Sequence, residues 1–212
     1  MFFKKHLFLS IILFLLSSFS LNNRIVDLGI TTKEGQTQFE ILTDNFPTSK
    51  GCKVYHSYKK ELDVFKGVHC AINLSEALLG SGYELPCVKG SMCWGECSTR
   101  KHRKHIVNAS VLGAFFLKKY RDKVVELKGA NYYKYVKGKK GIIYFENYWT
   151  KKEDRKGYPS GDHIDLWDGK KLLAYGGFGT WVRNHSNYTI EHGGAGPSPL
   201  QKAEKVYFIE LR

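Results

Sequence analysis

Helix-forming sequence precedes strand-forming sequence along this chain, and that order restricts the folds it can adopt. The stretch 70–79 carries Ala and Leu on one face and ends at a Gly-Ser-Gly sequence, which predicts a helix with a glycine stop. Apolar residues then recur at roughly helical spacing over 106–128, which predicts a second helix. Runs rich in β-branched and aromatic residues follow, at 141–145, 163–167, 171–175 and 206–211. Helices first and a sheet afterwards predict an α+β domain.

The first 20 residues have the layout of a secretory signal peptide. Lys4 and Lys5 precede an apolar run at 7–16, and serines follow it. A membrane anchor is the alternative, but the run is well short of the roughly 20 residues that span a bilayer. We therefore expect no stable membrane anchor and a secreted or periplasmic location. The expected division is a signal peptide at 1–20, an N-terminal extension at 21–60, polar and extended, and one domain at 61–212 with a cysteine-rich loop at 87–97.

The chain is strongly basic, with a formal net charge of +13 at pH 7. Such a charge favours an anionic partner through long-range attraction, and a nucleic acid, a membrane surface and an anionic cell-wall polymer all qualify. Export argues against a nucleic acid, and the basic residues are not grouped in a nucleic-acid-binding motif. Charge alone leaves the wall and the membrane surface open.

Five cysteines, an odd number in an exported chain, suggest that one thiol stays outside the disulfides. If Cys70 is that thiol, the other four form two bridges in one of three pairings. Those four are Cys52, Cys87, Cys93 and Cys97. A zinc site built from this cluster with His102 or His105 is the alternative. The spacing matches no common zinc module and export favours disulfides, so we expect neither a metal nor another cofactor.

Cys70 and His163 are the candidate nucleophile and general base of a cysteine hydrolase. Cys70 starts the predicted helix, where the helix dipole and free backbone N–H groups favour a thiolate. His163 begins an alternating strand in which it shares a face with Asp165, while Ile164 and Leu166 form the core-facing side. Structural alternatives exist for both, because a cysteine can be a disulfide partner or a small buried side chain, and a histidine can simply lie on the surface.

Four segments carry a family resemblance in their order along the chain. They are Gly67-Val-His-Cys-Ala-Ile-Asn-Leu-Ser-Glu-Ala-Leu78, the stretch 137–145, Gly161-Asp-His-Ile-Asp-Leu-Trp-Asp-Gly169, and the closing run 206–211. Over roughly residues 60–212 the chain resembles the fourth group of type VI secretion amidase effectors, which are papain-like cysteine peptidases related to the NlpC/P60 enzymes. The resemblance implies a papain-like fold with the cysteine at a helix N-terminus, packed on an antiparallel sheet.

The same resemblance implies a chemistry and a substrate. Cys70 would be the nucleophile and His163 the general base. The substrate would be bacterial peptidoglycan, cut in its stem peptides between D-glutamate and diaminopimelate, and an immunity protein is a candidate partner. Tyr148, Trp149 and Trp181 are candidate groove residues, although aromatic side chains are more often simply part of a core.

The third group of that family, an aspartate on the strand after the histidine, is harder to place here. If positions 168–169 form a two-residue turn, antiparallel pairing puts Ala174 opposite His163, and alanine cannot orient an imidazole. Asp165, on the same strand face as His163, is the expected third residue of the site. The alternatives are Asp162, Asn184, or no third residue at all.

The predicted function is a secreted peptidoglycan amidase. The signal peptide departs from the family, because effectors injected by a type VI machine usually need none. Two other functions stay open on the sequence. One is a catalytically decayed protein that binds the wall or a membrane and keeps the fold, with Ala174 marking the lost third group. The other is a papain-like protease that acts on proteins.

Overall fold

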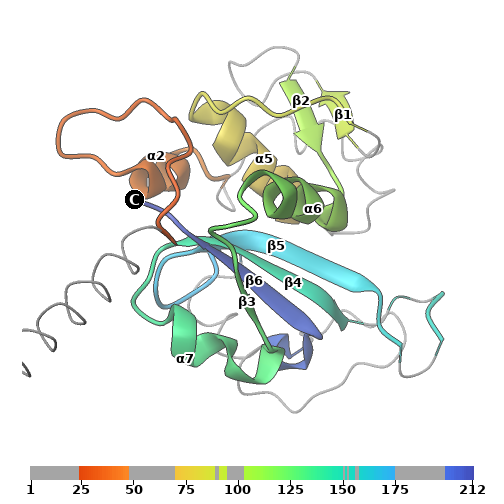
Figure 1. Ribbon diagram of the computed structural model, residues 1–212. Coiled ribbons are helices and arrows are strands. Elements are labelled where there is room, and N and C mark those ends of the chain that lie inside the picture. Colours follow the sequence, from red (N-terminus) through yellow and green to blue (C-terminus); the bar gives the residue numbers. More distant parts are fainter. Residues whose placement is uncertain are drawn as a thin grey trace, which may run out of the picture.

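The computed structural model describes residues 24–47, 70–88, 91–94, 103–149, 151, 153–155, 158–174 and 199–212 (Figure 1). The α-helices are α2 (Gln38–Asp44), α5 (Cys70–Gly80), α6 (Ala109–Lys119) and α7 (Tyr132–Val136). Short 3-10 helices are η3 (Gly129–Asn131) and η4 (Leu200–Lys202). The strands are β1 (Ser91–Trp94), β2 (Arg103–Ile106), β3 (Val125–Leu127), β4 (Gly141–Trp149), β5 (Gly161–Trp167) and β6 (Lys205–Glu210).

A four-stranded antiparallel sheet with the strand order β3-β6-β4-β5 lies at the centre of the described structure. Helices α2, α5 and α6 lie on one side of it and α7 on the other (Figure 1). Both faces are therefore buried. Ile164 and Leu166 of β5 belong to the core cluster under α5 and α6, whereas Phe145 and Trp167 belong to the cluster that includes α7. Helices packed on an antiparallel sheet confirm the predicted α+β class.

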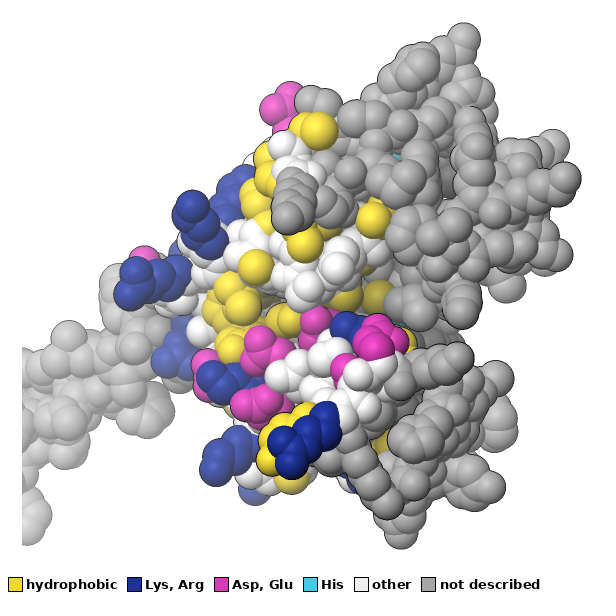
Figure 2. Space-filling view, turned by 90° about the vertical axis from the view of Figure 1, so that its right-hand side faces the viewer, with side chains coloured by type: hydrophobic (Ala, Val, Ile, Leu, Met, Phe, Trp, Pro, Cys, Tyr) yellow, Lys and Arg dark blue, Asp and Glu magenta, His cyan; other side chains and the backbone are white. Residues whose placement is uncertain are grey.

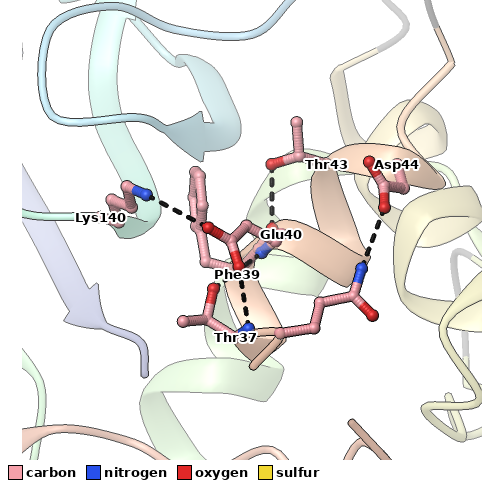
Figure 3. A network of polar contacts seen from close by, with 7 residues as sticks. Thr37, Phe39, Glu40, Thr43, Asp44 and Lys140 are labelled. Carbon is pink, nitrogen blue, oxygen red and sulfur yellow. Dashed lines mark hydrogen bonds and ion pairs between the residues drawn. The ribbon is translucent and has the colours of Figure 1, made fainter. Parts of the chain in front are cut away.

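Residues 24–47 pack into the core, and the prediction of a polar, extended lead is wrong for this stretch. Thr37 and Glu40 form a capping box that begins α2 (Figure 3). The Thr37 hydroxyl accepts from the Glu40 N–H at 3.2 Å, and the Glu40 carboxylate accepts from the Thr37 N–H at 2.9 Å. The helix buries Phe39 and Leu42 in the same cluster as α5, and Val26 pairs with the chain next to β6. Polar residues separate these apolar side chains in the sequence, which hides their shared burial.

The predicted signal peptide at 1–20 lies outside the described residues. So does part of the predicted cysteine-rich loop, of which β1 is described and forms a hairpin-like antiparallel pair with β2. In the described part of the chain, no helix combines the length and the apolar character needed to cross a membrane.

The second helix is shorter than the predicted span of 106–128. Asn108 caps α6, because its side-chain oxygen accepts from the N–H of Ser110 at 2.9 Å, and the helix ends at Tyr120. The chain then turns and enters β3, which pairs with β6. The apolar residues Val124 and Leu127 continued the helical stripe by coincidence, although they belong to the segment that leads into and forms β3.

The turn after β5 also differs from the prediction, and so does the strand expected at 171–175. Trp167 forms an isolated bridge with Leu172, so positions 168–171 make a four-residue loop rather than a two-residue turn. The Asp168 carboxylate stabilises this loop by accepting from the N–H groups of Lys170 and Lys171, both at 2.8 Å. The bridge between Trp167 and Leu172 is the last residue pair described along this edge of β5. It shifts the residue opposite each β5 position by two from the prediction.

Acidic and basic side chains lie together on one face of the described structure (Figure 2). Figure 2 shows the face on the right-hand side of Figure 1, where acidic side chains and lysine or arginine side chains lie next to each other below hydrophobic ones. On the sheet, Lys205 pairs with Glu126 at 3.2 Å, and the carboxylates of Glu146 and Asp162 are close enough to affect each other.

Candidate active site

Cys70 begins α5, as predicted, and its sulfur faces the edge of β5. The thiol is free, and the residue is 7% exposed. β5 is the last strand of the described sheet, so its outward N–H groups are open to partners outside the sheet. One of them, the N–H of Ile164, donates to the Cys70 sulfur. The sulfur therefore lies between the start of a helix and a strand edge, both of which offer N–H groups to a negative charge.

His163 lies on β5 and is 2% exposed, so the alternative of a surface histidine is wrong. Its imidazole makes a hydrogen bond with the Cys70 side chain, and its Nε2 lies 3.5 Å from Oδ2 of Asp165. The rings of Phe145 and Tyr148 lie beside it, with centroids 6.2 and 6.0 Å from that of the imidazole. The structure thus brings the predicted nucleophile, the predicted base and Asp165 into one buried group.

Asp165 is fully buried, and two backbone groups fix its carboxylate. The N–H of Leu166 donates to Oδ1 at 2.7 Å, and the N–H of Ala174 donates to Oδ2 at 3.0 Å. The oxygen that accepts from Ala174 is also the one that faces Nε2 of His163. The carboxylate is therefore held where it can orient the imidazole and receive a hydrogen bond from it.

Two earlier expectations about the third residue are corrected by this geometry. Ala174 lies beside Asp165 and not opposite His163, because the loop after β5 is two residues longer than expected. Asp162 does not approach the imidazole, since its carboxylate accepts from the N–H of Asn147 at 3.0 Å. The remaining alternative, Asn184, lies outside the described residues.

The protonation of Cys70 and His163 is coupled. Burial raises the pKa of Cys70, but the charge and hydrogen bond of His163 and the Ile164 N–H outweigh it and lower the pKa below the ordinary 9.0. Burial lowers the pKa of His163, but the Cys70 sulfur and Asp165 outweigh it and raise the pKa from 6.5 to about 10. Each shift favours the charged form, so the contact between the two side chains favours a thiolate beside an imidazolium.

Two side chains of α5 attach the helix to β2 on the side away from the strand edge. The Ser75 hydroxyl donates to the carbonyl of Ile106 at 3.0 Å and accepts from its N–H at 3.1 Å. Glu76 contacts Nε2 of His105 at 2.7 Å, and both side chains are buried. These contacts fix the helix that carries Cys70, and no sequence pattern predicts them because β2 is far from α5 along the chain.

The zinc alternative gains no support from this arrangement. His105 contacts Glu76, and His102 lies outside the described residues. Among the residues that the structure describes, no three His, Cys, Asp or Glu side chains are grouped as metal ligands would be. The disulfide pairing stays a prediction, because Cys52 and Cys97 are not among the described residues.

Comparisons with known proteins bear on the family and the fold of the chain. The family model of type VI secretion system (T6SS) amidase effector protein 4 matches residues 67–207. The crystal structure of the type VI effector Tae4 from Enterobacter cloacae is similar, with a TM-score of 0.55 and 14% sequence identity, covering 85% of this chain and 100% of that chain. The Tae4–Tai4 effector–immunity complex from the same organism has a TM-score of 0.47 and 16% identity, covering 82% and 94%. No curated protein matches the sequence.

The likeness to the first of these structures shows a shared fold. It confirms the predicted fold class, a papain-like domain of the NlpC/P60 type in which a helix packs on an antiparallel sheet.

Proposed function

Because the chain belongs to the type VI secretion system amidase effector protein 4 family, we propose that it cleaves peptidoglycan stem peptides by cysteine catalysis. The bond between D-glutamate and diaminopimelate is the expected target. The observation that carries the proposal is the buried contact of Cys70, at the start of α5, with His163, whose other neighbour is Asp165. Acyl transfer needs a nucleophile that contacts a base, and a base that contacts an orienting carboxylate. Cys70, His163 and Asp165 contact one another in that order.

In the proposed reaction the Cys70 thiolate attacks the carbonyl carbon of the scissile amide. The C–N bond then breaks, and His163 gives its proton to the departing amine. A water molecule attacks the resulting thioester, His163 takes one of its protons, and the carboxylic acid product leaves with the thiolate restored. The elevated pKa of His163 and the lowered pKa of Cys70 favour the charged pair from which this cycle starts.

Two further features would support the transition state. Backbone N–H groups at the start of α5 point in the direction that stabilises a developing oxyanion. Asp165 is proposed as a positioning residue, because it contacts Nε2 and leaves the other ring nitrogen, Nδ1, for the sulfur. Contacts on both sides of the ring would limit rotation of the imidazole away from the thiol.

The alternative of a decayed, non-catalytic protein has lost its main support. It depended on Ala174 standing where an orienting carboxylate should be, and in the structure Ala174 lies next to such a carboxylate. The cell wall as partner, the predicted export by a signal peptide and an immunity protein that blocks the site remain proposals. Such an immunity protein would form a stoichiometric complex with this protein, and hydrolysis of peptidoglycan would stop in that complex.

Hydrolysis of purified peptidoglycan tests the function. Wild-type protein, Cys70→Ala and Cys87→Ala are each incubated with sacculi that contain diaminopimelate, and released fragments are identified by mass spectrometry. Cys87 is an exposed cysteine outside the site, so its variant is the matched control. We expect new stem-peptide fragments from wild type and Cys87→Ala only, and their masses name the bond. Equal release by Cys70→Ala, or none by wild type, would overturn the proposal.

A further inference from the structure

The strand pair that carries His163 contains an irregularity next to the site. Phe145 of β4 pairs with His163 of β5, but the next pair is Trp149 with Gly161. Three residues of β4 therefore lie opposite one residue of β5, which makes a bulge. Its middle residue, Asn147, has a φ of 52°, in the left-handed region that side chains other than glycine rarely adopt. Asparagine is among the residues that tolerate this conformation best.

Specific contacts hold the bulge in place. The carboxylate of Asp162 accepts from the N–H of Asn147 at 3.0 Å. The side-chain amide of Asn147 donates to Glu204 at 2.9 Å, and the N–H of Glu204 donates to the carbonyl of Glu146 at 3.0 Å. The indole N–H of Trp149 donates to the carbonyl of Asp162 at 3.3 Å. Both strands and the chain before β6 thus take part in fixing one unusual backbone conformation.

The bulge changes the face on which one side chain lies. In a regular strand, positions 145 and 148 point to opposite faces, because their separation is odd. Here Tyr148 joins Phe145 in the same core cluster, and their ring centroids are 6.1 Å apart. The Tyr148 ring meets the imidazole of His163 edge-on, with an angle of 65° between the planes. Tyr148 is only 7% exposed, so it covers the imidazole from solvent.

We propose that Tyr148, placed by the bulge at Asn147, is a positioning residue for His163. Its ring and that of Phe145 keep the imidazole in the orientation in which one nitrogen faces Cys70 and the other faces Asp165. Its cover also keeps water away from the contact between His163 and Asp165, which strengthens that contact. This inference rests on the proposed catalysis by Cys70 and His163.

Two pairs of variants test the inference. Asn147→Gly and Asn147→Val both lose the amide contact with Glu204, but only valine is strained at a φ of 52°. Tyr148→Phe keeps the ring and Tyr148→Ala removes it. The readout is the rate at which iodoacetamide alkylates Cys70, followed from pH 4 to 10 by mass spectrometry of the Cys70 peptide, together with kcat and KM for hydrolysis.

We expect Asn147→Gly and Tyr148→Phe to keep the wild-type pH profile. Asn147→Val and Tyr148→Ala should move the acidic limb of the profile to higher pH and lower kcat at least about tenfold, with a smaller change in KM. A merely structural role would lower the melting temperature without moving the profile of the folded protein. If Asn147→Val does not fold, as judged by circular dichroism, the Tyr148 pair decides alone.

The outcomes separate this inference from the function on which it rests. If wild-type Cys70 reacts no faster at pH 6 than an ordinary thiol, the proposed catalysis fails. If wild type reacts as a thiolate and Tyr148→Ala keeps the same profile and kcat, the catalysis stands and the positioning role of Tyr148 is wrong.

Discussion

Replacing Asp165 by asparagine tests the buried site most directly, because the change keeps the size of the side chain and alters what it can accept. The carboxylate accepts from two N–H groups, one on each oxygen, and faces Nε2 of His163. An amide has one acceptor oxygen and one NH2 group. Leu166 is fully buried whereas Ala174 is exposed, so the amide oxygen should stay on the Leu166 N–H, since the Ala174 N–H can turn to water.

That orientation presents the NH2 group to His163. Nε2 must then act as an acceptor, and the imidazolium loses its anionic partner. Hydrogen bonds to charged groups are worth about 1.5 to 3 kcal/mol, so the reactivity of Cys70 near pH 6.5 should fall about 10- to 150-fold. The free energy of unfolding should fall by about 1 to 3 kcal/mol, the cost of one donor left without its partner.

The assay is alkylation of Cys70 by iodoacetamide between pH 5 and 9, with urea unfolding measured on the same samples. Asp168→Asn is the matched control, because its side-chain oxygen can still accept from the N–H groups of Lys170 and Lys171 in the turn. It should behave as wild type in both measurements. An Asp165→Asn variant that alkylates within twofold of wild type across this range would refute the orienting role assigned to the carboxylate.

Three other changes have expected outcomes. Ser75→Ala leaves the buried N–H and carbonyl of Ile106 without the hydroxyl and should cost about 1 to 3 kcal/mol in urea unfolding, so an unchanged midpoint would contradict the attachment of α5 to β2. The raised pKa of His163 gives stability below pH 6.5 that is lost toward about 10, and the lowered pKa of Cys70 gives stability above pH 9.0 that is lost as pH falls. The two trends oppose each other between pH 6.5 and 9.0, so the stability of wild type relative to Cys70→Ser should change less there than above pH 9.0, where it should fall as the pH rises toward 10. A steeper slope between pH 6.5 and 9.0 than above pH 9.0 would argue against the ion pair. A Cβ at Gly141 would clash with the backbone oxygen of Ile209 in β6, so Gly141→Ala should cost about 3 kcal/mol. A melting temperature equal to that of wild type would show that the two strands can move apart there without loss of stability.

The helix that begins at Cys70 and the strand that carries His163 were predictable because their signals are local. The α5 start at Cys70 and its stop at Gly80 follow from neighbouring residues, and so does the alternation of β5. The extent of α6 was not predictable, because Val124 fits the apolar stripe of a helix as well as it fits a strand. Its true limits come from the Asn108 cap and from pairing of the next segment with β6, a partner more than 70 residues away.

The third residue shows a different limit of prediction. Asp165 was identified from the strand face that it shares with His163, and the structure places the two in contact. The prediction that Ala174 lies opposite His163 failed because the Asp168 side chain lengthens the turn, and a change of two residues moves every partner along β5. The bulge at Asn147 could not be foreseen either, because it depends on Asp162 and Glu204 from separate parts of the chain.

The position of Cys70 at the outer edge of β5 also bears on self-association. Strands at the edge of a sheet offer hydrogen-bonding groups to which another molecule can add a strand, and natural proteins block such edges. In the described sheet, the N–H of Ile164 faces the Cys70 sulfur, and the carbonyl of Leu166 accepts from the N–H of Leu173 at 3.0 Å. The atom proposed to attack the substrate therefore also occupies a place on this edge where a neighbouring molecule would otherwise pair.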